Sequence, residues 1–151
     1  MPTSLSLVLG LGSRACAFPL AHAIEAMRPL PIVTLAGVPP YVLGLAIIRG
    51  GPMPVVHLGR LVGAGEADVV SRFVTLRLGD RKMALAVRSV LGVRELDPGS
   101  IDRLPPIFGP ESAAIIESIG RLDSELLLVL GSMRLLPESI WTAVSARGAA
   151  S

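Results

Sequence analysis

Chemically reactive and aromatic residues are scarce in this sequence of 151 residues. It contains one cysteine, Cys16, which excludes a disulfide within the chain and is typical of a reducing compartment. Lysine occurs once, at Lys82, and aromatic residues make up only 3% of the chain. Neither a basic cluster nor aromatic residues interleaved with basic ones are present. Nucleic-acid binding by phosphate neutralisation and base stacking is therefore disfavoured.

The residues that usually carry catalysis or bind metals are equally few. His22 and His57 are the only histidines, and neither has a metal-ligating partner three or four residues away. The sequence has no paired-cysteine motif, no zinc-protease helix motif and no phosphate-binding loop with its lysine. No serine lies in a nucleophile elbow. We therefore predict a protein that is not an enzyme and holds no cofactor or metal, with a hydrolase using His57 as a rival hypothesis.

Two uncharged stretches could be mistaken for membrane segments. Residues 1–13 carry no charged side chain, but no basic residue precedes them and residues 4–9 alternate as a strand does. Residues 30–48 are uncharged as well, but Pro31, Pro39 and Pro40 would break a membrane-spanning helix. The sequence thus predicts a cytoplasmic protein that does not insert into a membrane.

The apolar segments are short, rich in branched residues and separated by turn residues. This pattern predicts a small all-β sandwich or barrel. The expected strands span residues 5–9, 15–20, 42–48, 53–58, 73–78, 83–87, 90–96, 113–119 and 126–130. The uninterrupted apolar run at 42–48 predicts a strand covered on both faces. Pro137 and Glu138 predict the start of a short C-terminal helix.

A weak internal repeat divides the chain. Leu-Gly-Ser-Arg at 11–14 returns as Leu-Gly-Asp-Arg at 78–81, and both copies have the pattern of strand, tight turn and strand. The glycine-rich, polar stretch at 63–68 is the expected boundary between the halves. The expected organisation is a single domain over 1–151. It contains a first barrel at 1–66, a second barrel at 67–136, and a helix and tail at 137–151.

One charged residue stands out from this pattern. Arg49 ends the seven-residue apolar run and precedes Gly50 and Gly51. An arginine at the end of a strand is often merely solvated. The functional alternative is a charge that a rigid strand holds at the rim of a barrel, where its planar guanidinium could bind a partner or hold a loop.

Residues 41–58 resemble the core signature of the CheW family, in which a glycine precedes "NLRG" and then "PVVDL" follows. Here Gly44, Arg49-Gly50 and Pro54-Val55-Val56 occupy the matching positions. Residues 17–25 resemble the family's strand and following segment, which ends in a glutamate. Residues 31–40 resemble its connecting loop, and residues 78–90 and 118–136 resemble its later stretches. The resemblance covers nearly the whole chain.

The resemblance implies an all-β fold of two small five-stranded SH3-like barrels packed side by side. It also implies a chemotaxis adaptor without catalytic activity, cofactor or metal. The implied partners are the cytoplasmic signalling tip of a methyl-accepting chemoreceptor and the regulatory domain of a CheA-type histidine kinase. The implied mode is a helix in a groove. Matched position by position, the receptor-binding candidates are Ala23, Glu25, Gly44 and Arg49, and the kinase-binding candidates are Val93 and Ser118. Self-association is left open.

Several positions depart from the family pattern. The asparagine of "NLRG" is Ile47, the aspartate of "PVVDL" is His57, and an acidic position further on is Arg88. Two glycines are Ala84 and Ser118, and the second of these positions is the family's kinase-side glycine. These changes leave an alternative open, an accessory copy that binds the receptor but engages the kinase weakly or not at all. A barrel that binds a small molecule or nucleic acid is a rival of another class, disfavoured by the shortage of stacking aromatics.

Overall fold

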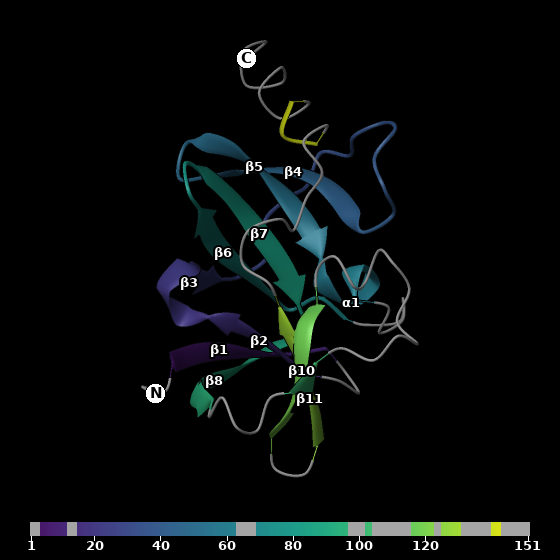
Figure 1. The fold of residues 1–151 in the computed structure, drawn as a ribbon. Helices are drawn as coiled ribbons and strands as arrows, with labels where there is room; N and C mark the ends of the chain where they lie inside the picture. Colours follow the sequence, from purple (N-terminus) through teal and green to yellow (C-terminus); the bar gives the residue numbers. More distant parts are fainter. Residues whose placement is uncertain are drawn as a thin grey trace.

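The computed structural model describes residues 4–11, 15–62, 69–96, 102–103, 116–122, 125–130 and 140–142, which form two β-sheets stacked on each other (Figure 1). Sheet A has the strand order β8 (Ser89–Leu96), β1 (Ser4–Gly10), β2 (Ala15–Pro19), β11 (Glu125–Leu130), β10 (Ile116–Leu122), β9 (Asp102–Arg103). Sheet B has the order β3 (Ala23–Met27), β6 (Arg72–Leu78), β7 (Arg81–Val87), β5 (Gly51–His57), β4 (Val42–Ile48). The short helices η1 (Leu20–His22) and α1 (Leu58–Leu61) follow β2 and β5.

The two halves of the sequence exchange strands between the sheets. The hairpin β1–β2 lies in sheet A, but the strands that follow it, β3 to β5, lie in sheet B. The hairpin β6–β7 lies in sheet B, and the strands after it lie in sheet A. Each hairpin is joined to strands of the other half by one parallel pairing, β2 with β11 and β7 with β5, and by one antiparallel pairing, β1 with β8 and β6 with β3.

The expected division of the chain into two barrels stays a prediction, and the sheets divide the chain differently. The repeat is present as two hairpins, but the expected barrels at 1–66 and 67–136 do not coincide with the sheets, because each sheet takes strands from both halves. Hydrophobic alternation identifies strands from local sequence, whereas pairing partners depend on contacts between distant residues. The repeat therefore gave no sign of the exchange.

The larger core cluster fills the space between the sheets. Leu9 and Phe18 contribute to it from sheet A, and Leu76 and Leu85 from sheet B, and all four are fully buried. Trp141, in the helical turn at 140–142, packs against the same cluster and is 9% exposed. Burial of these large side chains is the main force holding the sheets together.

A second core cluster lies on the other face of sheet B. Ala84 and Ala86 of β7 point into it with Phe73 of β6, while the residues between them on β7 point into the larger cluster. The central strand β7 is therefore buried on both faces. Residues 42–48, expected to be covered on both faces, form an outermost strand of sheet B in which five of the seven residues are buried and only Ile47 is exposed, at 66%.

Most expected strands are present with shifts of a few residues. The structure adds β3, β9 and the helix α1, which begins at Leu58 where the sequence predicted the end of a strand. A helical turn occurs at 140–142, while Pro137 and Glu138, the predicted helix start, lie outside the described residues. Among the described parts of the chain, no helix has the length and hydrophobicity needed to cross a membrane.

Candidate functional site

The turn between β4 and β5 holds Arg49 in an unusual backbone conformation. Ile48 and Gly51 are the last cross-strand pair, which leaves Arg49 and Gly50 as a two-residue turn. Their φ angles are 53° and 83°, both positive as a type I′ turn requires. Glycine and asparagine adopt this conformation readily, whereas a residue with a long side chain is strained there. Such strain persists where the surrounding structure imposes it, and often at sites of function.

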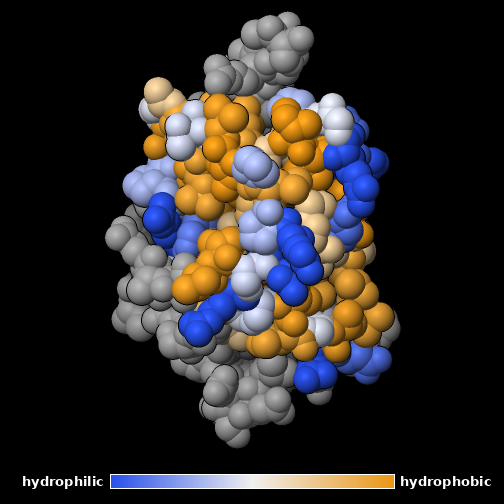
Figure 2. Space-filling model, turned by 180° about the vertical axis from the view of Figure 1, so that it is seen from behind, coloured by the Kyte–Doolittle hydropathy of each residue, from blue (hydrophilic) through white to orange (hydrophobic). Residues whose placement is uncertain are grey.

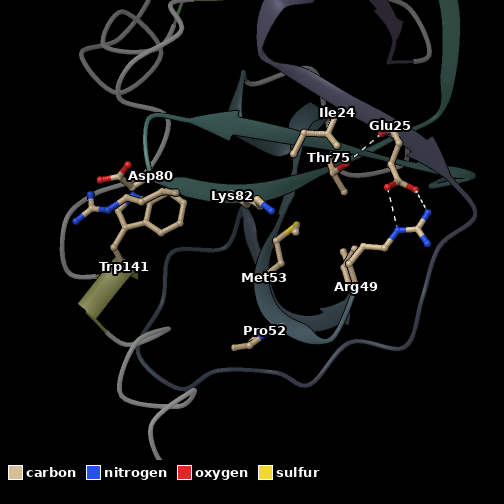
Figure 3. Close-up of a pocket in the computed structure, with 12 residues that line it drawn as sticks. Ile24, Glu25, Arg49, Pro52, Met53, Thr75, Asp80, Lys82 and Trp141 are labelled. Carbon is tan, nitrogen blue, oxygen red and sulfur yellow. Dashed lines mark hydrogen bonds and ion pairs between the residues drawn. The ribbon is translucent and has the colours of Figure 1, made fainter.

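Arg49 forms a two-pronged ion pair with Glu25 of β3. Its Nε donates to Glu25 Oε2 at 3.0 Å, and its terminal nitrogen donates to Oε1 at 2.6 Å (Figure 3). The Arg49 side chain is 76% exposed and that of Glu25 is 28% exposed. Because β3 and β4 are the two outermost strands of sheet B, this pair links opposite ends of the sheet. The pair therefore lies at the surface in a fixed geometry.

The hydrogen bonds from Arg49 lower the pKa of the Glu25 carboxyl, against a smaller opposing effect of burial. The same hydrogen bonds raise the pKa of Arg49. A carboxylate with a lowered pKa stabilises the folded state above its unfolded pKa and loses that contribution as the pH falls through the folded value. The pair is therefore intact at neutral pH and breaks only in acid.

Gly44 is required by the chain's own packing. Its φ of 142° lies in a region that side chains rarely adopt, and a Cβ there would come within 2.1 Å of the carbonyl oxygen of Val33. Val33 reaches β4 through two backbone hydrogen bonds of 2.8 Å with Leu45. The close approach that Gly44 permits is therefore made by the segment before β4, and Gly44 itself is buried.

The structure brings together two of the four receptor-side candidates. Glu25 and Arg49 face the same groove, whereas Gly44 lies beneath the segment containing Val33. Ala23 is half-buried at the start of β3, where it packs against the larger core cluster. Sequence reasoning missed Ile24, which is the extra residue of a β-bulge and lines the groove with 46% of its surface exposed.

The groove lies along the end of sheet B and has a volume of about 330 Å³. Its apolar surface comes from Ile24, Ile48, Pro52 and Met53. Charged side chains lie on two sides of it, with the Glu25–Arg49 pair on one side and the β6–β7 turn on the other (Figure 3). Beside that turn, the guanidinium of Arg81 lies 5.1 Å from the centre of the Trp141 ring. An apolar surface flanked by fixed charges suits one face of an amphipathic helix.

The kinase-side candidates lie in sheet A. Val93 is 44% exposed on β8, an outermost strand, and Leu91 and Leu5 beside it are 50% and 48% exposed. Ser118 lies in β10, where its backbone pairs with Val129 and Arg103. Because β1, β2 and β11 lie between β8 and β10, the sheet does not make these two residues neighbours.

His57 caps the N-terminus of helix α1. It is 4% exposed at the end of β5, and its Nδ1 accepts a hydrogen bond of 3.1 Å from the backbone N–H of Arg60. This is the N-cap bond of α1, which satisfies a backbone donor that a helix end leaves open. Aspartate is itself a favoured N-cap residue, so a histidine here can supply the acceptor that an aspartate would supply.

Replacing His57 with alanine should lower the free energy of unfolding by about 1–2 kcal/mol, because the cap of α1 is lost. Replacement with asparagine, which keeps an acceptor, should lower it by less than half as much. Thermal unfolding followed by circular dichroism measures both. Partner binding by both variants should stay within about twofold of the wild type. A hydrolytic activity that disappears with the alanine variant would contradict this structural role and favour the rival hydrolase.

The described residues show no other constellation suited to chemistry. Among them, no three histidine, cysteine, aspartate or glutamate side chains gather as metal ligands would. Cys16 is buried in the core between the sheets. Figure 2 shows a face with extended apolar areas interrupted by hydrophilic residues. Surfaces of this kind are typical of proteins that bind other proteins.

The protein consists of two stacked β-sheets, with a groove that is lined by apolar residues and flanked by charged ones. These features define a small all-β scaffold. The sequence profile of the CheW-like domain matches residues 6–139, and the chain belongs to this family. Protein FrzA of Myxococcus xanthus is 27% identical over 143 residues, which cover 89% of this chain and 86% of FrzA. The crystal structure of the scaffolding protein TtCheW from Thermoanaerobacter tengcongensis matches with a TM-score of 0.75. It is 22% identical, and the match covers 89% of this chain and 92% of that chain.

These comparisons confirm the resemblance seen in the sequence. The fold class is confirmed as mostly β, with two SH3-like barrel subdomains and few helical residues. The identity as a CheW-like scaffold of chemotaxis signalling is confirmed as well.

Proposed function

We propose that this protein is a non-catalytic adaptor of the cytoplasm that links chemoreceptor signalling tips to a CheA-type histidine kinase. One observation carries the receptor half of the proposal. The strained turn of β4–β5 and the bidentate ion pair fix Arg49 and Glu25 at the rim of a groove with an apolar floor. Glycine or asparagine would adopt this turn with less backbone strain than arginine. We therefore infer that the arginine side chain is retained for its function.

The groove fits the chemistry of a receptor tip, which is a helical hairpin. Ile24 and Met53 offer apolar contacts to one face of a helix, and Arg49 offers a charge whose position is already fixed. Fixing the side chain in advance lowers the entropy lost on binding. Gly44 supports the same site indirectly, because the segment packed against it holds β4 in place.

The kinase half rests on sheet A. The exposed apolar residues around Val93 on β8 supply a surface that a second protein could cover without blocking the groove in sheet B. The alternative, an accessory copy that binds the receptor but engages the kinase weakly or not at all, is supported by a departure from the family pattern. Arg88, exposed just before β8, presents a positive charge where the family has an acidic residue. A kinase surface matched to that acid would be repelled here.

Two binding measurements test the proposal. Purified protein is titrated by calorimetry with a chemoreceptor tip hairpin and, separately, with a kinase regulatory domain. We expect binding to both, and Val93→Glu should weaken only the kinase complex. Binding to the tip alone would establish the accessory alternative. Binding to neither partner would overturn the adaptor function.

A further inference from the structure

The β6–β7 hairpin beside the groove carries an excess of positive charge. In the register of β6 and β7, Arg77 lies directly opposite Lys82, and both side chains are exposed. Like charges at directly opposed positions destabilise a sheet relative to a neutral or opposite pair. Among the described residues, no ion pair or side-chain hydrogen bond of either one is found. Within the described part of the chain, nothing offsets this repulsion.

The charged side chains on the two sides of the groove differ in the interactions that they already make within the chain. On one side, Glu25 and Arg49 form an ion pair with no net charge, although Arg49 stays 76% exposed to a partner. At the β6–β7 hairpin, Arg81 is already stacked against Trp141, and among the described residues that line the groove Asp80, in the turn, is the acid on this side. Three cationic and two acidic side chains line the groove, so its net charge is positive even before Arg77 is counted.

The position of Lys82 relates this charge to the apolar floor. Lys82 and Met53 lie in the middle of the groove, between the Glu25–Arg49 pair on one side and Trp141 on the other (Figure 3). A bound helix that places an apolar side chain on Met53 would bring residues one turn away on that helix over Lys82. A carboxylate at that place would meet an ammonium that lacks an ion pair within the described chain.

We propose that Lys82 and Arg77 form a carboxylate-binding contact that selects an acidic amphipathic helix in the groove. The proposal rests on the receptor-binding function proposed above and adds the chemistry by which one receptor helix would be preferred over another. Charge complementarity argues for a partner with glutamate or aspartate beside its apolar stripe. A second copy of this chain is the less suitable occupant, because its described surface is not predominantly acidic.

Lys82 offers an unusually clean test, because it is the only lysine in the sequence. Carbodiimide joins amines to carboxylates that already touch, and the chain offers only Lys82 and its terminal amine. With the tip hairpin bound, we expect an amide between Lys82 and an aspartate or glutamate of the hairpin, identified by mass spectrometry. Lys82→Arg keeps the charge and should abolish this product while leaving affinity within about twofold.

Affinity measurements provide the second arm. The double variant Arg77→Glu/Lys82→Glu should bind the tip hairpin about tenfold more weakly at low salt and show a smaller salt dependence than the wild type. The single variant Lys82→Glu should also bind more weakly, yet its melting temperature should not fall, because a repulsive cross-strand pair becomes an attractive one. Weaker binding without loss of stability would therefore assign Lys82 to the interface.

Other outcomes overturn the inference. These are unchanged affinity of the double variant, crosslinks of Lys82 to a second copy of this chain, or products at the terminal amine alone. If such results accompany normal binding by the wild type and loss of binding by an Arg49 variant, the receptor-binding function stands and only the role of Lys82 falls. If the wild type itself does not bind the hairpin, both proposals fall together.

Discussion

Reversing the charge of Arg49 should weaken binding to a receptor tip hairpin by roughly thirtyfold or more, because the variant loses a charge at the interface and repels Glu25. The effect is large because Arg49 is held in place before the partner arrives. Its two hydrogen bonds to Glu25 and its turn leave little freedom to be lost on binding. Calorimetric titration of Arg49→Glu against the wild type measures the change.

Two further variants separate binding from folding. Arg49→Asn suits a type I′ turn better than arginine does, so its melting temperature should be equal to or above that of the wild type while its binding is lost. The double variant Glu25→Arg/Arg49→Glu restores an ion pair in the opposite orientation. It should stay folded and still fail to bind. Full binding by this double variant would mean that the pair only holds sheet B together and that Arg49 does not contact the partner.

The second large effect should come from Gly44→Ala, which we expect to lower the free energy of unfolding by about 3 kcal/mol. A side chain at the φ of Gly44 costs about 1–3 kcal/mol in backbone strain. A comparable cost follows from the clash with Val33, whose carbonyl oxygen would lie 2.1 Å from the new carbon. For a chain of this size the melting temperature should fall by about 6–12 °C.

Gly51→Ala is the matched control for this variant. Gly51 is in the neighbouring strand of the same sheet, its backbone is not in the left-handed region, and nothing lies within 4 Å of the added carbon. Its unfolding free energy should therefore stay within about 0.5 kcal/mol of the wild type. Thermal and urea unfolding of both variants provide the comparison. Equal stability of the two would show that the segment containing Val33 can move away from β4 at little cost.

The sequence predicted local structure well and long-range structure poorly. Alternation and turn residues placed most strands, because each strand's apolar face is a local pattern. The exchange of strands between the sheets left no local trace, because the sequence of a strand does not specify which distant strand it pairs with. Residues 42–48 show the same limit. Their apolar run predicted a strand buried on both faces, which holds for most of β4, but nothing in the run marked Ile47 as the exposed residue.

The candidate site was predictable only in part. The family pattern singled out Arg49 and Glu25, but their ion pair joins residues from opposite edges of a sheet, a distance that no spacing in the sequence reveals. Ile24 was missed because bulges change which residues face outward by one position. The opposition of Arg77 and Lys82 depends on the exact register of β6 and β7, although the tight turn between them was a signal that could have given it.

The exchange of strands also has a consequence for the order in which a growing chain can fold. Every strand of sheet B lies between residues 23 and 87, so its pairing can be complete while the ribosome is still adding the rest. The pairing of sheet A is completed later, because β2 pairs with β11, which is synthesised after all the strands of sheet B. Such distant pairings form slowly, and until then one side of β2 is open to other chains. We expect the interval between these two events to be when nascent molecules depend most on chaperones.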